Sequence, residues 1–418
     1  MGCSQLFGGH GHDSLFTARE MDSRWKSTRK GTSRAFSTEA LKAKFPLVLK
    51  KANELVEIIR GTSADEAIDF QPLFVRFTLD TAGLVGYNID FKALQNKHCP
   101  LFEALVYCSS EALASSANPC RGVVKRLFPS GKLAQECDKL YGQLYNEYDW
   151  ILKELRGRGE PAADDHSLWA CLMRLKDPET GVPLDDELLC PEVATFILAA
   201  TDTTAHQAMW AMFAIAALPD VQRKIEAEIK GCGMFQRLRK GGVDRLTYSD
   251  ITSLNYLTMV TKEAMRLFPS TSLGTLRCTT KDGERVCGYR VPKNTYVIAC
   301  IHALFNAPWL WEHPEHFNPE RWSNQARQEA SEVDARSERK GATRSFWSFS
   351  DGPRDCIGQR LAMMELLSVM AVLLANFEFR LADKMGGWDG ACSRQYNAMA
   401  LAIDGGMWLQ CHPRTDAA

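Results

Sequence analysis

Residues 349–358 form a short stretch in which a cysteine lies close to an arginine and to two glycines. A Gly-Pro pair within it excludes regular structure, so we predict a loop that leads into the apolar helix after it. Cys356 would lie where this helix begins, and N–H groups of the first turn would favour its thiolate, the form that binds a metal. Gly352 and Gly358 would let a flat cofactor approach the backbone, and Arg354 would meet an anionic group on it. Alone, the cysteine would also fit a buried thiol in a turn.

A second set of polar residues interrupts the long apolar segment 191–218. Asp202 and Thr203 lie in its middle, where such side chains compete with backbone hydrogen bonds and can open a local groove. The acidic side chain also argues against a membrane span. The small residues just before them, Ala199 and Ala200, would let a ligand lie against the helix. Taken alone, the segment equally fits a core helix whose hydroxyl groups are satisfied.

Two further pairs share a face of a predicted helix. Trp25 and Arg29 are four residues apart, and Glu263 and Arg266 are three residues apart. Without further context, the first pair fits a solvated basic helix with one packed tryptophan. The second pair fits a surface ion pair, which would stabilise the protein little.

The complete spacing Phe-x-x-Gly-x-Arg-x-Cys-x-Gly, from Phe349 to Gly358, resembles the haem-thiolate loop of the cytochromes P-450. The resemblance implies that Cys356 is the ligand of the iron of haem b. It also implies that Phe349, Gly352, Arg354 and Gly358 belong to the cofactor-binding loop. A thiolate ligand favours O–O cleavage, so the expected chemistry is monooxygenation.

Other motifs of that family follow in the family's order along the chain. Asp202 and Thr203 resemble its oxygen-activation motif, which implies that they hold water and deliver protons. Ala200 stands where the family usually has glycine. By family position, the substrate pocket would be lined by Phe196, Ala199, Ala200, Leu273 and Met399.

The resemblance also assigns residues that hold the cofactor and the core. Trp25 and Arg29 match a pair that binds a haem propionate, and Arg277 matches a further propionate-binding arginine. The family holds its core behind the haem loop with a buried ion-pair triad, to which three residues of this chain correspond: Glu263, Arg266 and Arg321.

These correspondences imply a monooxygenase that hydroxylates or epoxidises a lipophilic substrate. No flavin or nicotinamide fingerprint is present, so NADPH–cytochrome P-450 reductase or a similar donor would supply the electrons. Basic residues near the thiolate side could steer such a partner: Lys26, Lys30, Arg34, Arg344 and Arg360. Two alternatives remain open, a catalytically silent haem protein and a member of the same fold that rearranges hydroperoxides without external electrons. Thr203 argues against the second alternative.

The composition is that of an ordinary globular protein. The chain has 418 residues, 45% hydrophobic and 24% charged, with a formal net charge of -1. The near-neutral charge argues against a nucleic-acid binder. Fourteen cysteines occur without a CxxC pair, which indicates small buried residues in a reducing compartment.

The elements that must position these residues are mainly helical with small β-sheets, as in the cytochrome P-450 fold. Apolar spacing predicts helices over 39–60, 71–86, 101–114, 132–156, 191–218, much of 218–268 and 361–377. Short hairpins are expected over 273–300, and short strands after 377. Loops are expected over 1–22 and between Pro119 and Pro129, with an exposed charged insertion over 323–344.

We expect one catalytic domain over residues 1–418. Family members carry a region before the first motif, with the membrane anchor, the first helices and the outer strands of the main sheet. Few residues precede Trp25 here. We therefore expect an N-terminally incomplete chain, with an unpaired strand edge, weak haem loading and a longer form upstream of Met1. Family resemblance implies the cytosolic face of the endoplasmic reticulum membrane.

Overall fold

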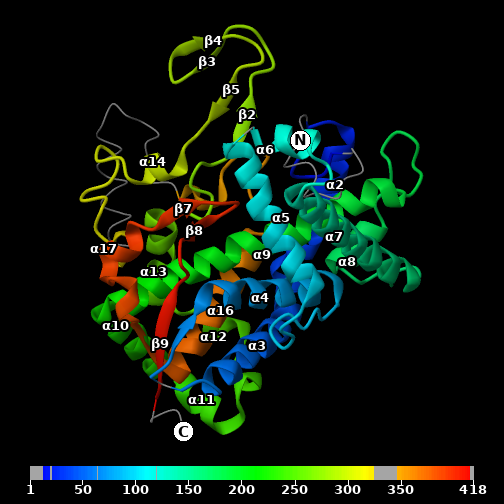
Figure 1. Ribbon diagram of the computed structural model, residues 1–418. Coiled ribbons are helices and arrows are strands. Elements are labelled where there is room, and N and C mark those ends of the chain that lie inside the picture. The colour runs from blue at the N-terminus through cyan, green and yellow to red at the C-terminus, as the bar shows by residue number, and fades with distance from the viewer. Residues whose placement is uncertain (1–12, 19–20, 64, 119, 324–345, 415–418) are drawn as a thin grey trace.

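The computed structural model describes residues 13–18, 21–63, 65–118, 120–323 and 346–414. Helices make up most of the molecule, and the strands form small antiparallel sheets (Figure 1). The helices are α2 (Ser23–Ser33), α3 (Thr38–Arg60), α4 (Phe70–Ala82), α5 (Pro100–Ala117), α6 (Cys120–Leu127), α7 (Lys132–Gly157), α8 (Leu168–Met173), α9 (Asp186–Ala217), α10 (Pro219–Gly231), α11 (Met234–Gly241), α12 (Tyr248–Thr252), α13 (Asn255–Leu267), α14 (Ile301–Phe305), α16 (Gln359–Asn376) and α17 (Gly387–Cys392). The strands are β1 (Ala67–Asp69), β2 (Leu276–Cys278), β3 (Glu284–Val286), β4 (Tyr289–Val291), β5 (Tyr296–Ile298), β6 (Phe377–Leu381), β7 (Gln395–Asn397), β8 (Leu401–Ile403) and β9 (Trp408–Pro413).

Helix α9 runs through the middle of the protein and is buried along most of its length. It begins after Asp185, whose carboxylate accepts a hydrogen bond from the N–H of Leu188. Apolar residues cover its whole circumference, so it packs against helices on several sides, including α4, α7, α13 and α16. The hydroxyl of Thr201 donates to the carbonyl of Ile197 at 2.7 Å, which satisfies this buried group within the helix. The polar interruption of the segment therefore does not end the helix.

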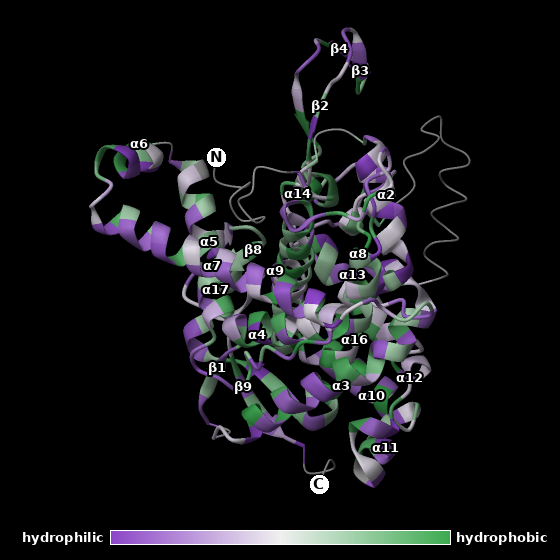
Figure 2. Ribbon diagram, turned by 90° about the vertical axis from the view of Figure 1, so that its right-hand side faces the viewer, coloured by the Kyte–Doolittle hydropathy of each residue, from purple (hydrophilic) through white to green (hydrophobic). Residues whose placement is uncertain are grey.

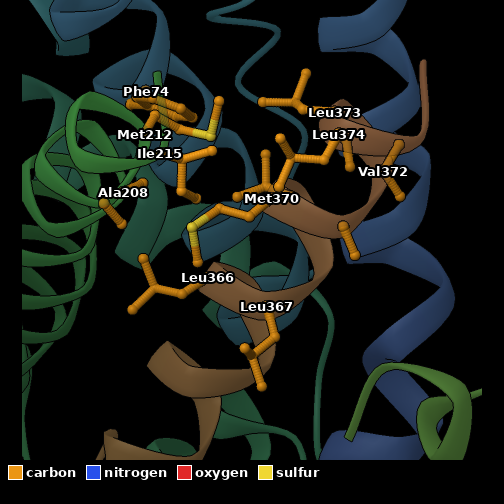
Figure 3. Close-up of a cluster of buried hydrophobic side chains, with 14 of the residues drawn as sticks. Phe74, Ala208, Met212, Ile215, Leu366, Leu367, Met370, Val372, Leu373 and Leu374 are labelled. Carbon is orange, nitrogen blue, oxygen red and sulfur yellow. The ribbon is translucent and has the colours of Figure 1, made fainter. Parts of the chain in front are cut away.

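Helix α16, which follows the cysteine loop, supplies the other half of this core. Figure 3 shows Leu366 and Met370 of α16 beside Ala208 and Met212 of α9, with Phe74 of α4 close by. Within the described residues, α16 alone is long and apolar enough to cross a membrane, but 72% of it is buried inside the protein. Burial of this extent identifies α16 as a core helix.

The sheets lie around this helical body. In the largest, the central strand β9 pairs with β1 on one side and β6 on the other. The remaining strands form the pairs β2–β5, β3–β4 and β7–β8, and the β3–β4 hairpin projects from the body (Figures 1 and 2). Strands β1 and β9 are far apart in the sequence but pair in this sheet, so the chain between them, which includes α9, returns to the place where it started.

The expected class, mainly helical with small sheets, is confirmed, and the helices predicted by apolar spacing form close to their expected ends. Two local predictions are wrong. The stretch between Pro119 and Pro129 contains helix α6, whose first N–H, that of Cys120, donates to the side chain of Asn118. The stretch expected to hold only strands after 377 includes the short helix α17. Nearly all of the insertion predicted over 323–344 lies outside the described residues.

Candidate active site

A cavity of about 640 Å³ lies between α9 and the loop that precedes α16. Most of the predicted site residues line it, although they come from four separate parts of the chain. These residues are Trp25, Arg29, Phe196, Ala199, Ala200, Thr203, Arg277, Phe349, Arg354, Cys356 and Gly358. Four predicted residues are not among those that line the cavity: Asp202, Leu273, Gly352 and Met399.

Backbone hydrogen bonds close the cysteine loop on itself. The N–H of Cys356 donates to the carbonyl of Phe349 at 2.9 Å, and that of Asp355 donates to the carbonyl of Gly352 at 3.0 Å. Gly352 has a φ of 79°, a left-handed conformation that a glycine adopts without strain. Its contribution is therefore the shape of the loop. A Cβ added at Gly358 would lie 3.9 Å from the sulfur of Cys356, so this glycine keeps the space beside the thiol open.

Cys356 lines the cavity and is exposed on that side, while the surrounding protein desolvates its sulfur. Burial raises its pKa above the ordinary value, and the N–H of Gly358 and the charge of Arg29 oppose this increase. The predicted N–H donor is present, but the expectation that the surroundings favour the thiolate is wrong for the protein alone, because desolvation outweighs the donors. A bound cation would replace the proton and stabilise the charged sulfur.

Two arginines form a cationic edge of the cavity. Arg354 packs its guanidinium 4.9 Å from the centre of the Trp25 ring, and its Nη2 is buried without a hydrogen-bond partner among the described residues. Burial and the nearby charge of Arg277 lower the pKa of Arg354. A buried, unpartnered guanidinium beside a second cation fits an anionic ligand, because an unpaired buried donor costs free energy.

The other two residues expected to bind a propionate have protein partners. Arg29 forms an ion pair with Asp355 and also donates to the carbonyl of that residue at 2.8 Å. The indole N–H of Trp25 donates to the carbonyl of Leu15 at 3.0 Å. Both residues would have to exchange these bonds to reach an anion in the cavity.

Helix α9 forms the wall of the cavity that faces the thiol loop. The hydroxyl of Thr203 donates to the carbonyl of Ala199 at 2.9 Å, and both residues line the cavity together with Ala200. Asp202 follows in the helix outside the cavity lining, with Oδ1 at 3.4 Å from Nδ1 of His206 and with Oδ2 buried and without a hydrogen-bond partner among the described residues. The wall thus combines small apolar side chains with one hydroxyl, and a carboxylate lies next to it in the sequence.

Two buried carboxyl groups near the cavity were missed by the sequence analysis. Glu365 of α16 lines the cavity, and burial raises its pKa to about 8, opposed by the hydroxyl of Thr81. Glu192 of α9 accepts the N–H of Leu15 with both oxygens, at 3.1 and 3.0 Å. Burial raises the pKa of Glu192 to about 7, against the opposing effects of Leu15 and Arg24. An acidic residue inside an apolar helix was the sequence signal that could have identified both.

The structure brings Glu263, Arg266 and Arg321 together away from the cavity. Arg266 donates to both carboxylate oxygens of Glu263 at 3.0 and 2.8 Å, and Arg321 donates to one of them at 3.2 Å. Both members of the first pair are fully buried. The indole N–H of Trp322 and the backbone N–H of Asn318 complete the shell around Glu263, at 2.9 Å each.

The predicted pocket positions Leu273 and Met399 lie elsewhere. The side chain of Leu273 is 55% exposed, because the chain turns at Gly274, which has a φ of 72°. Thr271 and Thr275, on either side of this turn, line the cavity instead. Met399 packs against the apolar cluster around α7 and the first half of α9.

These residues fit a haem. The cavity offers a sulfur ligand on one wall, small side chains on the opposite wall, and a cationic edge with an unpartnered buried guanidinium that suits a carboxylate.

Comparison with known proteins gives the same result. The family model described as Cytochrome P-450 matches residues 4–394. Cytochrome P-450 4F5 of Rattus norvegicus is 32% identical over 242 residues, which are 58% of this chain and 41% of the rat protein. Leukotriene-B4 omega-hydroxylase 3 of Mus musculus is 29% identical over 59% of this chain and 43% of its own length. The bifunctional cytochrome P-450/NADPH–P-450 reductase 2 of Bacillus subtilis (strain 168) is 26% identical over 88% of this chain and 32% of its own length. The matched part thus spans less than half the length of each of these relatives.

Because the family model covers nearly the whole chain, and the cysteine loop has the geometry described above, this protein belongs to the cytochrome P-450 family.

Proposed function

We propose that this protein is a haem-thiolate monooxygenase that inserts one oxygen atom of O2 into a lipophilic organic substrate, by hydroxylation or epoxidation. The observation that carries the proposal is the arrangement of three groups around one cavity: the thiol of Cys356, the unpartnered guanidinium of Arg354 and the small residues before Thr203. Haem b bound there would supply the activation of dioxygen, which a thiolate ligand favours.

The residues of the cavity would hold and orient the haem. Cys356 would provide the sulfur ligand. Arg354 and Arg277 would bind a haem carboxylate through charge-assisted hydrogen bonds, which are stronger than neutral ones. Trp25 and Arg29 would join them by exchanging their present protein partners. Three further residues would shape the cofactor-binding loop: Phe349, Gly352 and Gly358.

Thr203 on the opposite wall and Asp202 next to it would hold and transfer protons. The hydroxyl of Thr203 donates to the carbonyl of Ala199, so its oxygen can still accept a hydrogen bond from a water in the cavity. The buried Oδ2 of Asp202 has no hydrogen-bond partner among the described residues and could accept a proton from such a water chain. Ala200, with one methyl group more than glycine, narrows the space beside them.

A lipophilic substrate suits the walls of this cavity. Phe196 stacks on Phe36 with ring centroids 5.9 Å apart, and both rings line the cavity with Ala199 and Ala200. Apolar walls favour apolar ligands, and the few polar groups would orient them. The name of the mouse relative, a hydroxylase, supports hydroxylation as the reaction.

Electrons would come from an NADPH-dependent reductase on a separate chain. The Bacillus subtilis relative, named as both cytochrome P-450 and NADPH–P-450 reductase, carries the two activities in one chain and supports NADPH as the source of electrons. Four of the five predicted steering residues are exposed: Lys26, Lys30, Arg34 and Arg360. Arg344 lies outside the described residues. Exposed cations of this kind speed the approach of an acidic partner.

We also propose association with the endoplasmic reticulum membrane on its cytosolic face, as the family resemblance implies, and helix α6 supports contact with a membrane surface. Figure 2 shows α6 projecting from the body of the molecule, connected to α5. Its Val123 and Leu127, and Phe128 after it, are all more than half exposed, and Arg126 lies among them. Exposed apolar side chains next to basic ones suit a membrane surface.

Replacement of the proposed ligand tests the function. The reduced, carbon monoxide-bound protein should show the red-shifted Soret band of a thiolate-ligated haem, and Cys356→Ala should lose it. Cys120→Ala, which changes an exposed cysteine on α6, is the matched control and should keep the band. A Cys356→Ala protein that kept the band would refute the assignment. Two other results would refute the monooxygenase proposal. One is product that forms without reductase and NADPH. The other is a haem-loaded protein that forms no product with either electrons or hydroperoxides.

A further inference from the structure

Two imidazoles and a carboxylate meet on the surface, outside the haem cavity. The sequence His313-Pro314-Glu315-His316 lies in the segment after α14, on the side of the molecule that carries α17 (Figure 1). One ligand atom from each of His313, Glu315 and His316 lies within 4.8 Å of the other two. Oε1 of Glu315 is 3.9 Å from Nδ1 of His313 and 3.6 Å from Nε2 of His316.

The backbone of this turn is held from two directions. The N–H of His316 donates to the carbonyl of His313 at 3.1 Å, and the two imidazole rings stack with centroids 5.4 Å apart. The carbonyl of His313 also accepts from Arg321 at 2.7 Å, and that of His316 accepts from Arg266 at 3.1 Å. Both arginines are bonded to the buried Glu263. The side chains therefore project from a turn that is anchored to the buried triad, which lowers the entropy lost on binding an ion.

The charged groups around this turn favour the binding of a cation. Arg266 and Arg321 are the nearby positive groups, and both share the carboxylate of Glu263. Glu315 and Glu312, which line the same surface hollow, add two further negative charges. Three carboxylates therefore face two guanidinium groups, and the balance is negative.

We propose that His313, Glu315 and His316 bind one zinc ion. Imidazole and carboxylate are ligands that zinc takes in open sites, with a fourth position left for water or another group. Zinc–ligand distances near 2.0–2.2 Å in a tetrahedral site place neighbouring ligand atoms roughly 3.3–3.6 Å apart. The separations of 3.6 and 3.9 Å to Glu315 are close to this range, and the two stacked imidazoles would rotate so that a nitrogen of each faces the ion. Water or the Glu312 carboxylate would be the fourth ligand. The bound ion would link the side chains of the turn, whose backbone is bonded to Arg266 and Arg321.

Zinc binding to the haem-loaded protein tests the proposal. Calorimetric titration with zinc chloride should give one site per chain, weakened by at least about tenfold in His316→Ala, since even loss of an outer-shell partner costs this much. X-ray absorption at the zinc edge should show only nitrogen and oxygen ligands near 2.0–2.1 Å. His98→Ala is the matched control, because His98 is exposed and paired with one carboxylate, Glu103. Sulfur scattering near 2.3 Å, which would point to exposed cysteines, or equal affinity in parent and His316→Ala, would overturn the proposal.

Thermal unfolding gives an independent readout. Zinc should raise the Tm of the parent and of His98→Ala but not of His316→Ala, because an ion that binds only the folded state stabilises it. The bonds from Arg266 and Arg321 go to backbone carbonyls, so His316→Ala keeps them and should fold. An equal rise of Tm in all three proteins would contradict the site.

Discussion

Removal of the Glu263 carboxylate should destabilise the protein more than any surface ion pair would. In the structure this carboxylate accepts five hydrogen bonds, two from Arg266 and one each from Arg321, Trp322 and the N–H of Asn318. Glu263→Ala leaves the Arg266 guanidinium fully buried without its counter-charge. The group cannot reach water without opening the core between α13 and the segment from α14 to Trp322.

The expected size follows from that burial. Breaking a buried ion pair by removing one partner costs about 3–5 kcal/mol. The entropy of unfolding is about 2.1 cal/mol/K per residue, or roughly 0.9 kcal/mol/K for the chain length here. The predicted decrease of Tm is therefore roughly 3–6 °C, together with a lower haem content after purification.

Differential scanning calorimetry of the haem-loaded protein measures this decrease. Glu320→Ala is the matched control, because the neighbouring Glu320 pairs with Lys224 at 2.5 Å with both side chains about half exposed. An exposed pair of this kind contributes about 0–1 kcal/mol, so the control should lose roughly 1 °C or less. If Glu263→Ala lost no more than Glu320→Ala, the buried network would not stabilise the core as argued.

Three further predictions concern the cavity. Thr203→Ala should keep its haem but release more hydrogen peroxide and less product per NADPH consumed, because the hydroxyl on the α9 wall is lost; unchanged coupling with a known substrate would contradict the proton role. Arg354→Ala should bind haem roughly tenfold to a hundredfold more weakly, since hydrogen bonds to charged groups contribute about 1.5–3 kcal/mol. The rate of haem transfer to an acceptor protein measures this, and the exposed Arg360→Ala should behave like the parent. The pKa of Glu192, raised from 4.5 to about 7, means that the folded state binds its proton more tightly than the unfolded state, so the stability from this group is lost as pH rises through that range. The parent should lose on the order of 3 kcal/mol of unfolding free energy between about pH 4.5 and 7, and Glu192→Gln should not, so their Tm profiles should diverge over that range; parallel profiles would show that this carboxyl does not titrate as described.

The cysteine loop shows how much of the site local sequence determines. Glycine and proline limit the backbone between Phe349 and Gly358 to a loop, and the apolar run after it forms a helix, so the position of Cys356 at their junction follows from neighbouring residues alone. The burial of α9 also follows from local sequence, because a helix that is apolar on every side must be covered by the rest of the protein. Family membership rests on such local spacings, which survive wide changes in the rest of the chain.

Contacts between distant segments decided the other features of the site. Burial and local charge depend on residues that lie far apart in the sequence. The pKa of Cys356 follows desolvation rather than the nearby N–H donor, and Trp25 donates to Leu15 rather than to a cavity ligand. Leu273 is exposed because one turn reverses its direction, although its neighbours line the cavity.

The surface turn at His313 is the clearest case of a site that depends on tertiary structure. Its residues are adjacent in sequence, and their types are common on protein surfaces. The bonds from Arg266 and Arg321 hold the backbone carbonyls of this turn, and both arginines are bonded in turn to the buried carboxylate of Glu263. Sequence determined which groups the turn carries, and long-range packing determined that they converge.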